Sequence, residues 1–374
     1  MTTPAYDAIV IGLGAHGSAA AYHLAKGGAK VLGLERFPRG HTLGSSGGLS
    51  RIIRLSYFEH PDYVPLVRRA WDLWRELEAE SGEALLTQTG GLFLGPPDGD
   101  LVRGARLSAE KYDLAHEVLD AGALRDRYPL FRIDDGWAGL FDVQAGWLAP
   151  ERCIETHLRM AERRGASLRF EEPAQWEKDG DGVIVTTDGG TFHADRLVLT
   201  AGAWMPELLP DLAPQLWIER NVLFWFEPRE RVAEFAALPV WILEEDERTY
   251  YGFPYDPAHG FKLAGMHYGD RVDPNTVERE PREIDEERVR SFLRRRIPSA
   301  DGARRLAKVC MYTNSPDAHF VIDQLPGANV TFASACSGHG FKFASAIGEL
   351  LAAPAPDIPA LFRSERLRTP ATPR

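Results

Sequence analysis

The sequence predicts a mixed α/β fold of the α+β type, in which an antiparallel sheet is inserted into an α/β domain. Three observations support this class. A hydrophobic strand at residues 6–11 runs into a glycine motif at 12–17, and an alanine-rich helix and a second strand at 31–34 follow within about 30 residues. Strands and a helix of the same kind return at 150–212. Between 215 and 267 the pattern changes to long alternating strands, which is typical of an antiparallel sheet.

The glycine motif near the start of the chain predicts a dinucleotide site. Gly12 permits a tight turn, Gly14 lets the backbone approach a pyrophosphate, and Gly17 lets the helix pack closely on the strand. The helix N-terminus then faces the phosphates with free N–H groups and a partial positive charge. Glu35 ends the second strand, where a carboxylate can accept hydrogen bonds from the ribose hydroxyls. This motif alone does not separate NAD from FAD.

A second glycine segment favours FAD. The hydrophobic strand at residues 196–200 runs directly into Ala201-Gly202-Ala203-Trp204. A strand that ends in Thr-Ala-Gly is common in FAD proteins, where a second turn of the backbone approaches the cofactor. Since both signals agree, we expect the dinucleotide to be FAD.

Composition and charge argue against several other classes. The 374-residue chain is long enough for two or three domains, and its formal net charge of −11 argues against a role in binding nucleic acid or an anionic membrane. Three scattered cysteines are too few for a disulfide framework or a zinc site, so no metal is expected. No apolar run reaches membrane-spanning length, and only a short, mostly polar segment precedes the first strand. These observations predict a cytoplasmic enzyme.

Hydrophobic periodicity and turn residues predict the remaining elements. We expect helices at residues 61–82, 150–165 and 283–296 and after 342, with two short helices within 107–128. Strands are expected at 85–95, 167–171, 183–187, 191–194, 196–200, 216–227, 239–243, 249–253, 261–267, 305–312, 320–323 and 330–333.

The two kinds of pattern alternate along the chain, which predicts discontinuous domains. The cofactor-binding domain is expected at residues 1–82, 146–212 and 311–374. The substrate domain, which carries the antiparallel sheet, is expected at 83–145 and 213–310.

Three further segments carry a resemblance to a known family. They are the loop from His41 to Glu59, which contains Arg51-Ile-Ile-Arg54; the stretch 308–323, which contains Cys310-Met-Tyr312-Thr; and Ser337-Gly-His-Gly-Phe-Lys342. Together they resemble the monomeric sarcosine oxidase and N-methyltryptophan oxidase family of FAD-dependent amine oxidases, over roughly residues 6–350. The resemblance implies an FAD-binding Rossmann-like domain of the glutathione-reductase or D-amino-acid-oxidase type, with an inserted antiparallel-sheet substrate domain.

The resemblance also implies how FAD is held. Cys310 corresponds to the cysteine that forms a thioether to the flavin 8α-carbon, a reaction that needs a thiolate in a cationic setting. The cofactor-binding residues, from both glycine segments and the matching loops, are Gly12, Gly14, Gly17, Glu35, Arg36, His41, Gly44, Ser45, Ser46, Arg51, Ile52, Ala201, Gly202, Trp204, Cys310, Met311, Gly338, His339, Gly340, Phe341 and Lys342.

The same resemblance implies the substrate site. Arg54 and Lys342 correspond to the pair that holds the substrate carboxylate, and Lys262 to the lysine that the family uses for dioxygen. Arg51 packs against the flavin ring in the family, and tyrosines lie near the amine. The implied catalytic residues are Arg51, Arg54, Tyr251, Lys262, His267, Tyr312 and Lys342.

The sequence departs from this family at two positions. Gly47 stands where close relatives carry a histidine, four residues before Arg51, so the completeness of flavin attachment stays open. The relatives also place a histidine four residues after the dioxygen lysine, where this chain has Met266 and then His267. Because neighbouring residues on a strand point to opposite faces, either a bulge turns His267 into the site or Met266 replaces the histidine.

The resemblance implies the oxidation of a secondary amino acid, with FAD as cofactor and O2 as electron acceptor. Sarcosine would give glycine, formaldehyde and hydrogen peroxide. Other N-methyl or cyclic amino acids, such as N-methyltryptophan, pipecolate and proline, are alternatives, and so is a dehydrogenase that passes electrons to a quinone or a partner protein. The expected partners are a small amino acid and O2, with no nucleic acid or membrane, and the family suggests a monomer.

Overall fold

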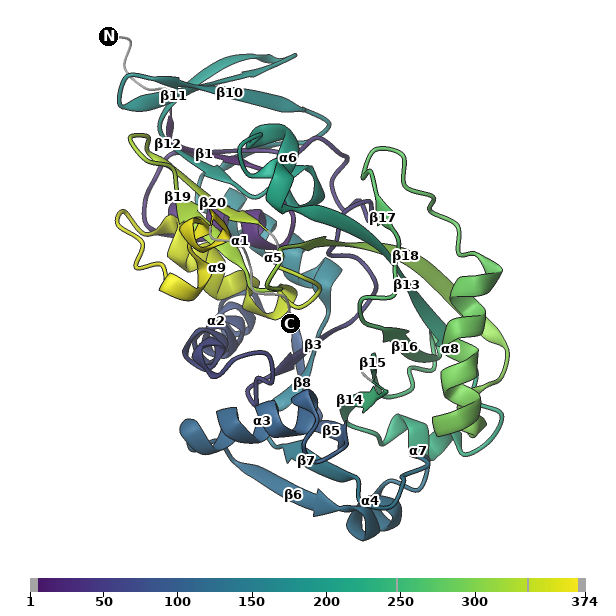
Figure 1. The fold of residues 1–374 in the computed structure, drawn as a ribbon. Coiled ribbons are helices and arrows are strands. Elements are labelled where there is room, and N and C mark those ends of the chain that lie inside the picture. Colours follow the sequence, from purple (N-terminus) through teal and green to yellow (C-terminus); the bar gives the residue numbers. More distant parts are fainter. Residues whose placement is uncertain (1–5, 247, 335, 369–374) are drawn as a thin grey trace.

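The protein is described here over residues 6–246, 248–334 and 336–368 of a computed structural model. The outermost ends of the expected cofactor domain, at 1–5 and 369–374, lie outside the described residues. Figure 1 shows two large sheets joined by the long strands β13 (Trp217–Phe226) and β18 (Arg304–Asn314). The mixed α/β class expected from the sequence is confirmed.

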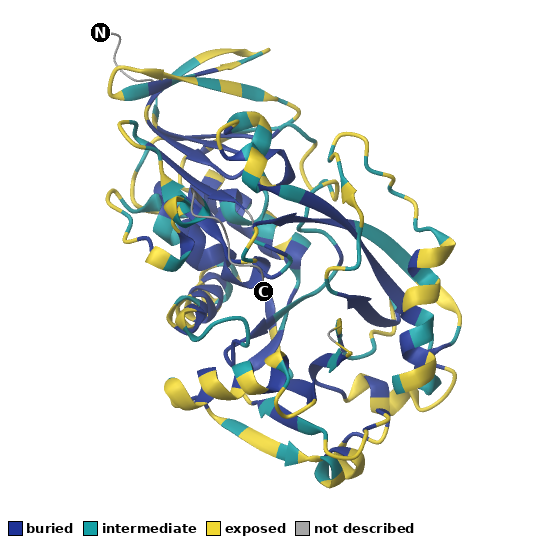
Figure 2. Cartoon of the chain, in the orientation of Figure 1, coloured by how far each residue is buried: buried dark blue, intermediate teal, exposed yellow. Residues whose placement is uncertain are grey.

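The first sheet contains the glycine motif. Its order is β10–β11–β12–β1–β2–β9, with β20 on β12 and β19 on β20. Strand β1 is parallel to β2 and β12, so the carboxyl ends of these strands meet at one edge, where ligands bind in such sheets. Its central strands are buried, whereas β10, at the edge, is largely exposed (Figure 2). The strands are β1 (Tyr6–Ile11), β2 (Val31–Leu34), β9 (Ser167–Arg169), β10 (Ala174–Asp179), β11 (Gly182–Thr187), β12 (Gly190–Leu199), β19 (Val321–Gln324) and β20 (Val330–Ser334).

Helix α1 (Ala15–Lys26) packs between α5 (Pro150–Arg163) and α9 (Ala344–Ala352). Its small residues allow this close approach, since a Cβ on Gly348 of α9 would lie 2.4 Å from the Cβ of Ala19. Helix α2 (Val64–Ser81) covers α9 from the other side and ends at Gly82, whose φ of +76° makes the left-handed cap. This layer holds the first turn of α1 firmly against the sheet.

The second sheet has the order β17–β13–β16–β15–β14–β5–β7–β6, with β18 on β13. Helix α8 (Glu283–Arg296) packs beside it, where Phe292 stacks on Tyr250 and Trp241. The other strands are β5 (Gly91–Gly95), β6 (His116–Asp120), β7 (Ala138–Asp142), β14 (Val240–Glu245), β15 (Arg248–Gly252), β16 (Phe261–Gly265) and β17 (Arg271–Val272). The remaining helices are α3 (Asp100–Lys111), α4 (Ala121–Arg127), α6 (Met205–Leu208) and α7 (Val232–Ala236).

A small third sheet lies between the two large ones. Strand β3 (Arg51–Arg54) pairs antiparallel with β8 (Ala145–Leu148), which also pairs with β4 (Leu86–Gln88). The Arg-Ile-Ile-Arg motif is therefore a short strand that lies between the two large sheets.

Two expectations about local structure are wrong in part. The second short helix, expected to begin near Asp120, is α4, which Asp120 caps; but the first is α3, which already begins at Asp100, and the edge strand β6 lies between the two helices. Helix α3 buries Leu101, Val102 and Ala105, an apolar face that lies before the expected start. The separate strands expected within 191–200 are one strand, β12, which pairs first with β11 and then with β1.

Candidate active site

A cavity of about 580 Å³ opens at the carboxyl edge of the first sheet. It is lined by most of the residues predicted to hold the adenosine and pyrophosphate. These are Gly12, Gly14, Glu35, Arg36, His41, Gly44, Ser45, Ser46, Ala201, Gly202, Trp204 and Phe341. Segments that are far apart in sequence therefore meet around one elongated space.

Each glycine of the motif is required for a different structural reason. Gly12 has a φ of +89°, and a Cβ there would lie 2.7 Å from the carbonyl oxygen of Thr200. A Cβ on Gly17 would lie 1.8 Å from the carbonyl oxygen of Gly12, so no larger residue fits between helix and strand. Gly14 caps α1, and its nearest neighbour would be Ser46 Oγ at 3.8 Å. The backbone at Gly14 is thus open to a phosphate.

Glu35 is fixed at the end of β2. Its carboxylate accepts hydrogen bonds from the backbone N–H groups of Leu13 (2.8 Å) and Phe37 (3.1 Å). His41 Nε2 lies 3.6 Å from the same carboxylate. The carboxylate is therefore held at the rim of the cavity, in the position where a ribose would meet it.

Several buried polar atoms around this cavity have no hydrogen-bond partner within the described chain. They are His16 Nε2, Ser45 Oγ, Thr313 Oγ1 and Ser334 Oγ, and all four residues line the cavity. A buried polar group without a partner is costly, so these atoms fit a cavity that a polar cofactor fills. The glycine turn, the carboxylate of Glu35 and these atoms together match the needs of FAD.

Cys310, on β18, does not line this cavity but contacts Ser45, which does. Its Sγ is 3.4 Å from the carbonyl oxygen of Ser45 and 3.6 Å from Nη2 of Arg51. The Arg51 guanidinium also donates to the carbonyl oxygens of Ser45, Gly47 and Ser50. The thiol therefore lies directly beside the Arg51 guanidinium. The loop that carries Gly47 is held by Arg51 itself.

Lys262, on β16, is buried against the same loop. Its Nζ donates to the carbonyl oxygens of Gly48 (2.7 Å) and Ser50 (2.6 Å) and to the Ser50 hydroxyl (3.1 Å). Burial, together with the positive charge of Arg51, holds the pKa of Lys262 well below its usual range. The backbone contacts fix this amine in place between β16 and the Arg51 loop.

Arg54 and Lys342 are buried close to one carboxylate that the sequence reasoning missed. Both Glu59 oxygens lie 2.7 Å from Arg54 Nη2, and Lys342 Nζ donates to the carbonyl oxygen of His339 (2.6 Å). Burial acts to raise the pKa of Glu59, but Arg54, His339 and Lys342 outweigh it and hold this pKa below its usual value. Glu59 thus remains ionised and offsets one of the two positive charges. In the sequence, only the position of Glu59 five residues after Arg54 could have indicated that the two residues form an ion pair.

The pKa of Lys342 predicts a pH effect on anion binding. Burial, with a further contribution from Arg54, lowers this pKa to about 7. Lys342 therefore carries its charge below pH 7 and loses it above. We expect the Kd of a thioether analogue of sarcosine, which has no titrating amine, to rise up to about tenfold per pH unit above 7. This Kd can be measured at each pH by titrating the protein with the analogue and following the flavin absorbance spectrum.

The control for this pH effect is Lys342→Met, which removes the titrating amine. Its Kd should be weaker but flat between pH 6 and 9. His339 does not interfere, because burial lowers its pKa to about 3. A wild-type Kd that is independent of pH over this range would contradict the assignment.

Tyr251 on β15 and Tyr312 on β18 contact one another, although β13 and β16 lie between their strands in the order of the second sheet. Their hydroxyl oxygens lie 3.4 Å apart, and burial raises the pKa of both phenols. They remain neutral hydrogen-bonding groups at ordinary pH.

The structure places both His267 and Met266 on the wall of a second cavity. Strand β16 ends at Gly265, and His267 takes a φ of +56°, so the chain turns rather than alternating. The His267 ring lies edge-on to Tyr312 with centroids 5.8 Å apart, and its Nδ1 is 3.3 Å from the buried carboxylate of Glu219. The catalytic role of His267 stays a prediction.

This second cavity measures about 1180 Å³ and is lined by segments of both expected domains. It is lined by Glu59, Met266, His267 and His339, whereas Ser45 and Phe341 line the first cavity. Arg54 contacts Glu59, and Cys310 contacts Ser45, so the residues expected at the flavin ring lie between the two cavities.

Some predicted cofactor residues line neither cavity. Ile52 packs in an apolar cluster with Phe253 and Trp147, and Met311 packs with Trp204. Their predicted contacts with the cofactor stay predictions. Gly17, Gly338 and Gly340 act through close packing: a Cβ on Gly338, for example, would lie 2.6 Å from the Tyr312 ring.

Comparison with known proteins gives a consistent picture. A family model described as FAD dependent oxidoreductase matches residues 7–353. Monomeric sarcosine oxidase of Streptomyces avermitilis is 44% identical over 358 residues, 94% of this chain and 93% of that protein. N-methyl-L-tryptophan oxidase of Yersinia pestis is 38% identical, covering 95% and 96%. The solved structure of NikD, an unusual amino acid oxidase essential for nikkomycin biosynthesis, superposes with a TM-score of 0.82 at 25% identity, covering 98% and 97%.

Among the described residues, no helix is long and apolar enough to cross a membrane, and no cluster of His, Cys, Asp and Glu is suited to a metal ion.

Proposed function

The chain belongs to the FAD-dependent oxidoreductase family, and on that premise we propose that it oxidises a secondary amino acid, with sarcosine as its substrate and O2 as electron acceptor. With sarcosine the balanced reaction consumes water and O2 and gives glycine, formaldehyde and hydrogen peroxide. The relatives named monomeric sarcosine oxidase support this choice of substrate. N-methyltryptophan and cyclic amino acids are the alternatives.

The observation that carries the proposal is the buried pair of Arg54 and Lys342, partly balanced by Glu59. A guanidinium and an ammonium in a dry site are suited to a carboxylate, and the planar fork of arginine adds orientation. Because Glu59 already occupies Arg54, a substrate carboxylate must take its place. The site therefore selects a substrate that brings its own anion.

The same cations help the amine to react. A secondary amine in water is protonated, with a pKa of about 10 like that of lysine, and its ammonium lacks the lone pair that oxidation needs. Neighbouring positive charges lower that pKa. Arg54 and Lys342 thus bind the carboxylate and disfavour the ammonium, while the oxygens of the neutral Tyr251 and Tyr312 hydroxyls can accept a hydrogen bond from the amine N–H.

FAD, when bound, would take a hydride equivalent from the carbon next to the nitrogen. The residues that would hold it are those of the glycine turn, Glu35 and the loop from His41 to Ser46. We propose that Cys310 carries it covalently, since its thiol lies beside Arg51. We also propose the domain division expected from the sequence. The cofactor-binding domain comprises residues 1–82, 146–212 and 311–374, and the substrate domain comprises 83–145 and 213–310.

The proposal includes a monomeric, cytoplasmic enzyme. The names of the relatives support the monomer. Cys153, Cys310 and Cys336 are all free thiols, which suits a reducing compartment.

A variant of Lys262 tests whether the enzyme is an oxidase, which uses O2 as acceptor, or a dehydrogenase, which does not. Burial lowers the pKa of Lys262, but the negative charge that moves onto O2 favours its protonated form, and an ammonium beside the reduced cofactor would stabilise that charge. We expect Lys262→Met to slow reoxidation by O2 roughly 100-fold or more, while anaerobic reduction by substrate changes far less. Stopped-flow reoxidation measures the first quantity and anaerobic mixing the second.

The ratio of products tests the acceptor directly. The wild type should form one peroxide for each sarcosine consumed. Turnover that requires an artificial quinone acceptor, with no peroxide, would instead show a dehydrogenase.

A further inference from the structure

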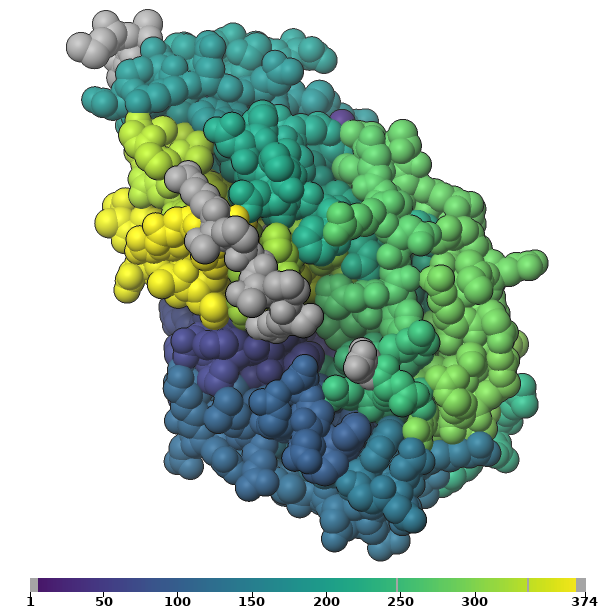
Figure 3. All heavy atoms as spheres, in the orientation of Figure 1, coloured from purple at the N-terminus to yellow at the C-terminus, as the bar shows by residue number. Residues whose placement is uncertain are grey.

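The larger cavity has far more room and more charge than sarcosine would use. Its volume of about 1180 Å³ exceeds what so small an amino acid fills. Its wall comes from segments that are distant in sequence. Figure 3 shows the face on which the blue segment around 100–111 approaches the green segment that follows 247, beside the purple segment around 58–62.

The carboxylates that line this cavity are all in ion pairs. Two pairs lie within the rim, and two use arginines from outside it. The pairs are Asp62 with Lys111, Asp100 with Arg103, Glu59 with Arg54, and Asp317 with Arg366. The acidic charge of the wall is therefore already neutralised.

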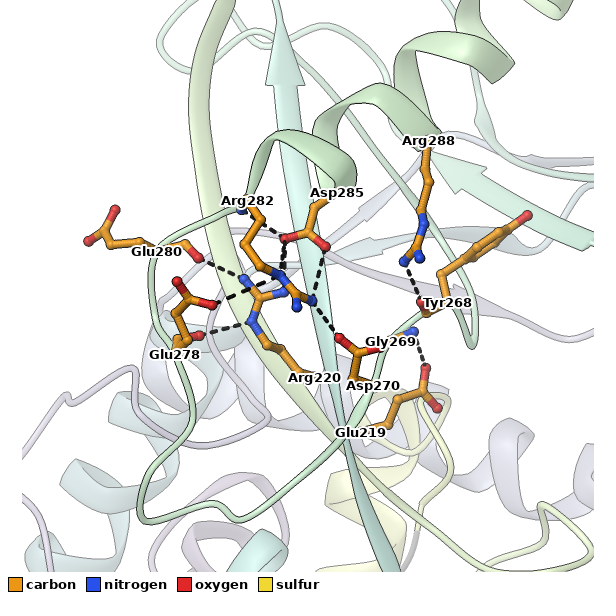
Figure 4. A network of polar contacts seen from close by, with 10 residues as sticks. All are labelled: Glu219, Arg220, Tyr268, Gly269, Asp270, Glu278, Glu280, Arg282, Asp285 and Arg288. Atoms are coloured by element: carbon orange, nitrogen blue, oxygen red, sulfur yellow. Dashed lines mark hydrogen bonds and ion pairs between the residues drawn. The ribbon is translucent and has the colours of Figure 1, made fainter.

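Two arginines of the same wall have no such partner. Over the described ranges, no carboxylate forms an ion pair with Arg248 or Arg288, although both are exposed and both line the cavity. Arg288 Nη1 donates to the carbonyl oxygen of Tyr268 at 3.0 Å (Figure 4), and the Arg248 guanidinium lies 5.6 Å from the centre of the Tyr268 ring. Both unbalanced guanidinium groups therefore lie beside the same residue of the wall, Tyr268.

Tyr268 also ties these arginines to the candidate active site. It follows His267 directly, and the next residue, Gly269, donates its N–H to Glu219, the carboxylate that His267 approaches (Figure 4). The unbalanced charge thus lies along the same turn that brings His267 against Tyr312. A substrate held by Arg54 at one end could extend toward it.

We propose that Arg248 and Arg288 form a second anion subsite, and that the enzyme oxidises N-methyl amino acids whose side chain ends in a second carboxylate. This inference rests on the proposed function, because the first carboxylate is assigned to Arg54 and Lys342. Guanidinium groups bind carboxylates through paired, charge-assisted hydrogen bonds. The neutral wall elsewhere offers such a group no comparable site.

The test compares dicarboxylic substrates with neutral isosteres on the holoenzyme. We expect kcat/KM for N-methyl-L-glutamate, or for its homologue with one more methylene, to exceed that for the matching N-methyl amide by about tenfold or more. In the double variant Arg248→Ala and Arg288→Ala this preference should disappear. The matched control is Arg103→Ala, which removes a rim arginine already paired with Asp100 and should keep the preference.

Two results would overturn the subsite. One is equal kcat/KM for acid and amide in the wild type. The other is a loss in the double variant that is as large for sarcosine as for the dicarboxylate, which would show general attraction of anions. Both leave the proposed function intact, because sarcosine still reduces the flavin; only the absence of reduction by every N-methyl amino acid removes that function, and the subsite with it.

Discussion

Replacing Cys310 by serine is expected to release the flavin from the acid-denatured protein. The wild type should give a yellow precipitate, because a thioether survives acid, whereas the variant should give a colourless precipitate and a yellow supernatant. The effect should be complete, since neither of the other cysteines has the same contacts with Arg51 and the loop at Ser45.

Cys153→Ser is the matched control for this experiment. Cys153 is buried on α5, and burial raises the pKa of its thiol well above the usual value, so it is an inert core residue. Its substitution should leave the flavin bound to the precipitate. A colourless precipitate from the wild type would refute the linkage while leaving the fold and the FAD site intact. Partial colour would show that attachment is incomplete with Gly47 in the loop.

Replacing Arg54 by alanine is expected to cost about 2–5 kcal/mol of substrate binding, the range for losing one member of a desolvated charge pair. The Arg54 side chain is only 2% exposed, so solvent screening is weak. The loss should be seen in KM and in the Kd of the thioether analogue. The variant also leaves Glu59 without its partner near the substrate carboxylate, which adds repulsion.

Glu59→Gln is the control, because it is expected to change the affinity for anionic ligands in the opposite direction. It removes the carboxylate that competes for Arg54, so anionic ligands should bind more tightly than in the wild type. If Arg54→Ala and Glu59→Gln weakened binding equally, the pair would be structural and Arg54 would not hold the substrate.

Local patterns were sufficient to predict much of the fold. The apolar spacing of 61–82 and the cap at Gly82 match η1 (Pro61–Tyr63) and α2, and the expected helix at 283–296 is α8. Strands that lack a strong local signal were missed. Strand β10 alternates only weakly, and β6 is an exposed edge strand that depends on pairing with β7. Their existence is decided by partners distant in sequence, which periodicity does not show.

The residues of the candidate site also fall into two groups, those that local sequence predicts and those that only the tertiary structure reveals. The glycine turn and Glu35 belong to one local unit, so spacing alone predicted them. The partners of the charged groups could not be predicted, because Arg54 with Glu59, and Lys262 with the carbonyl oxygens of Gly48 and Ser50, depend on how the small central sheet meets β16. The turn at His267 is likewise a property of the tertiary structure, since alternation along β16 ends one residue before Met266.

Anaerobic titration of the purified protein with sarcosine shows most directly whether this FAD-dependent enzyme oxidises a secondary amino acid bound by its carboxylate. The visible flavin absorbance should be bleached in proportion to added sarcosine, and it should return with hydrogen peroxide when air is admitted. A flavin that stays oxidised with sarcosine, and with every other N-methyl or cyclic amino acid, would contradict this function.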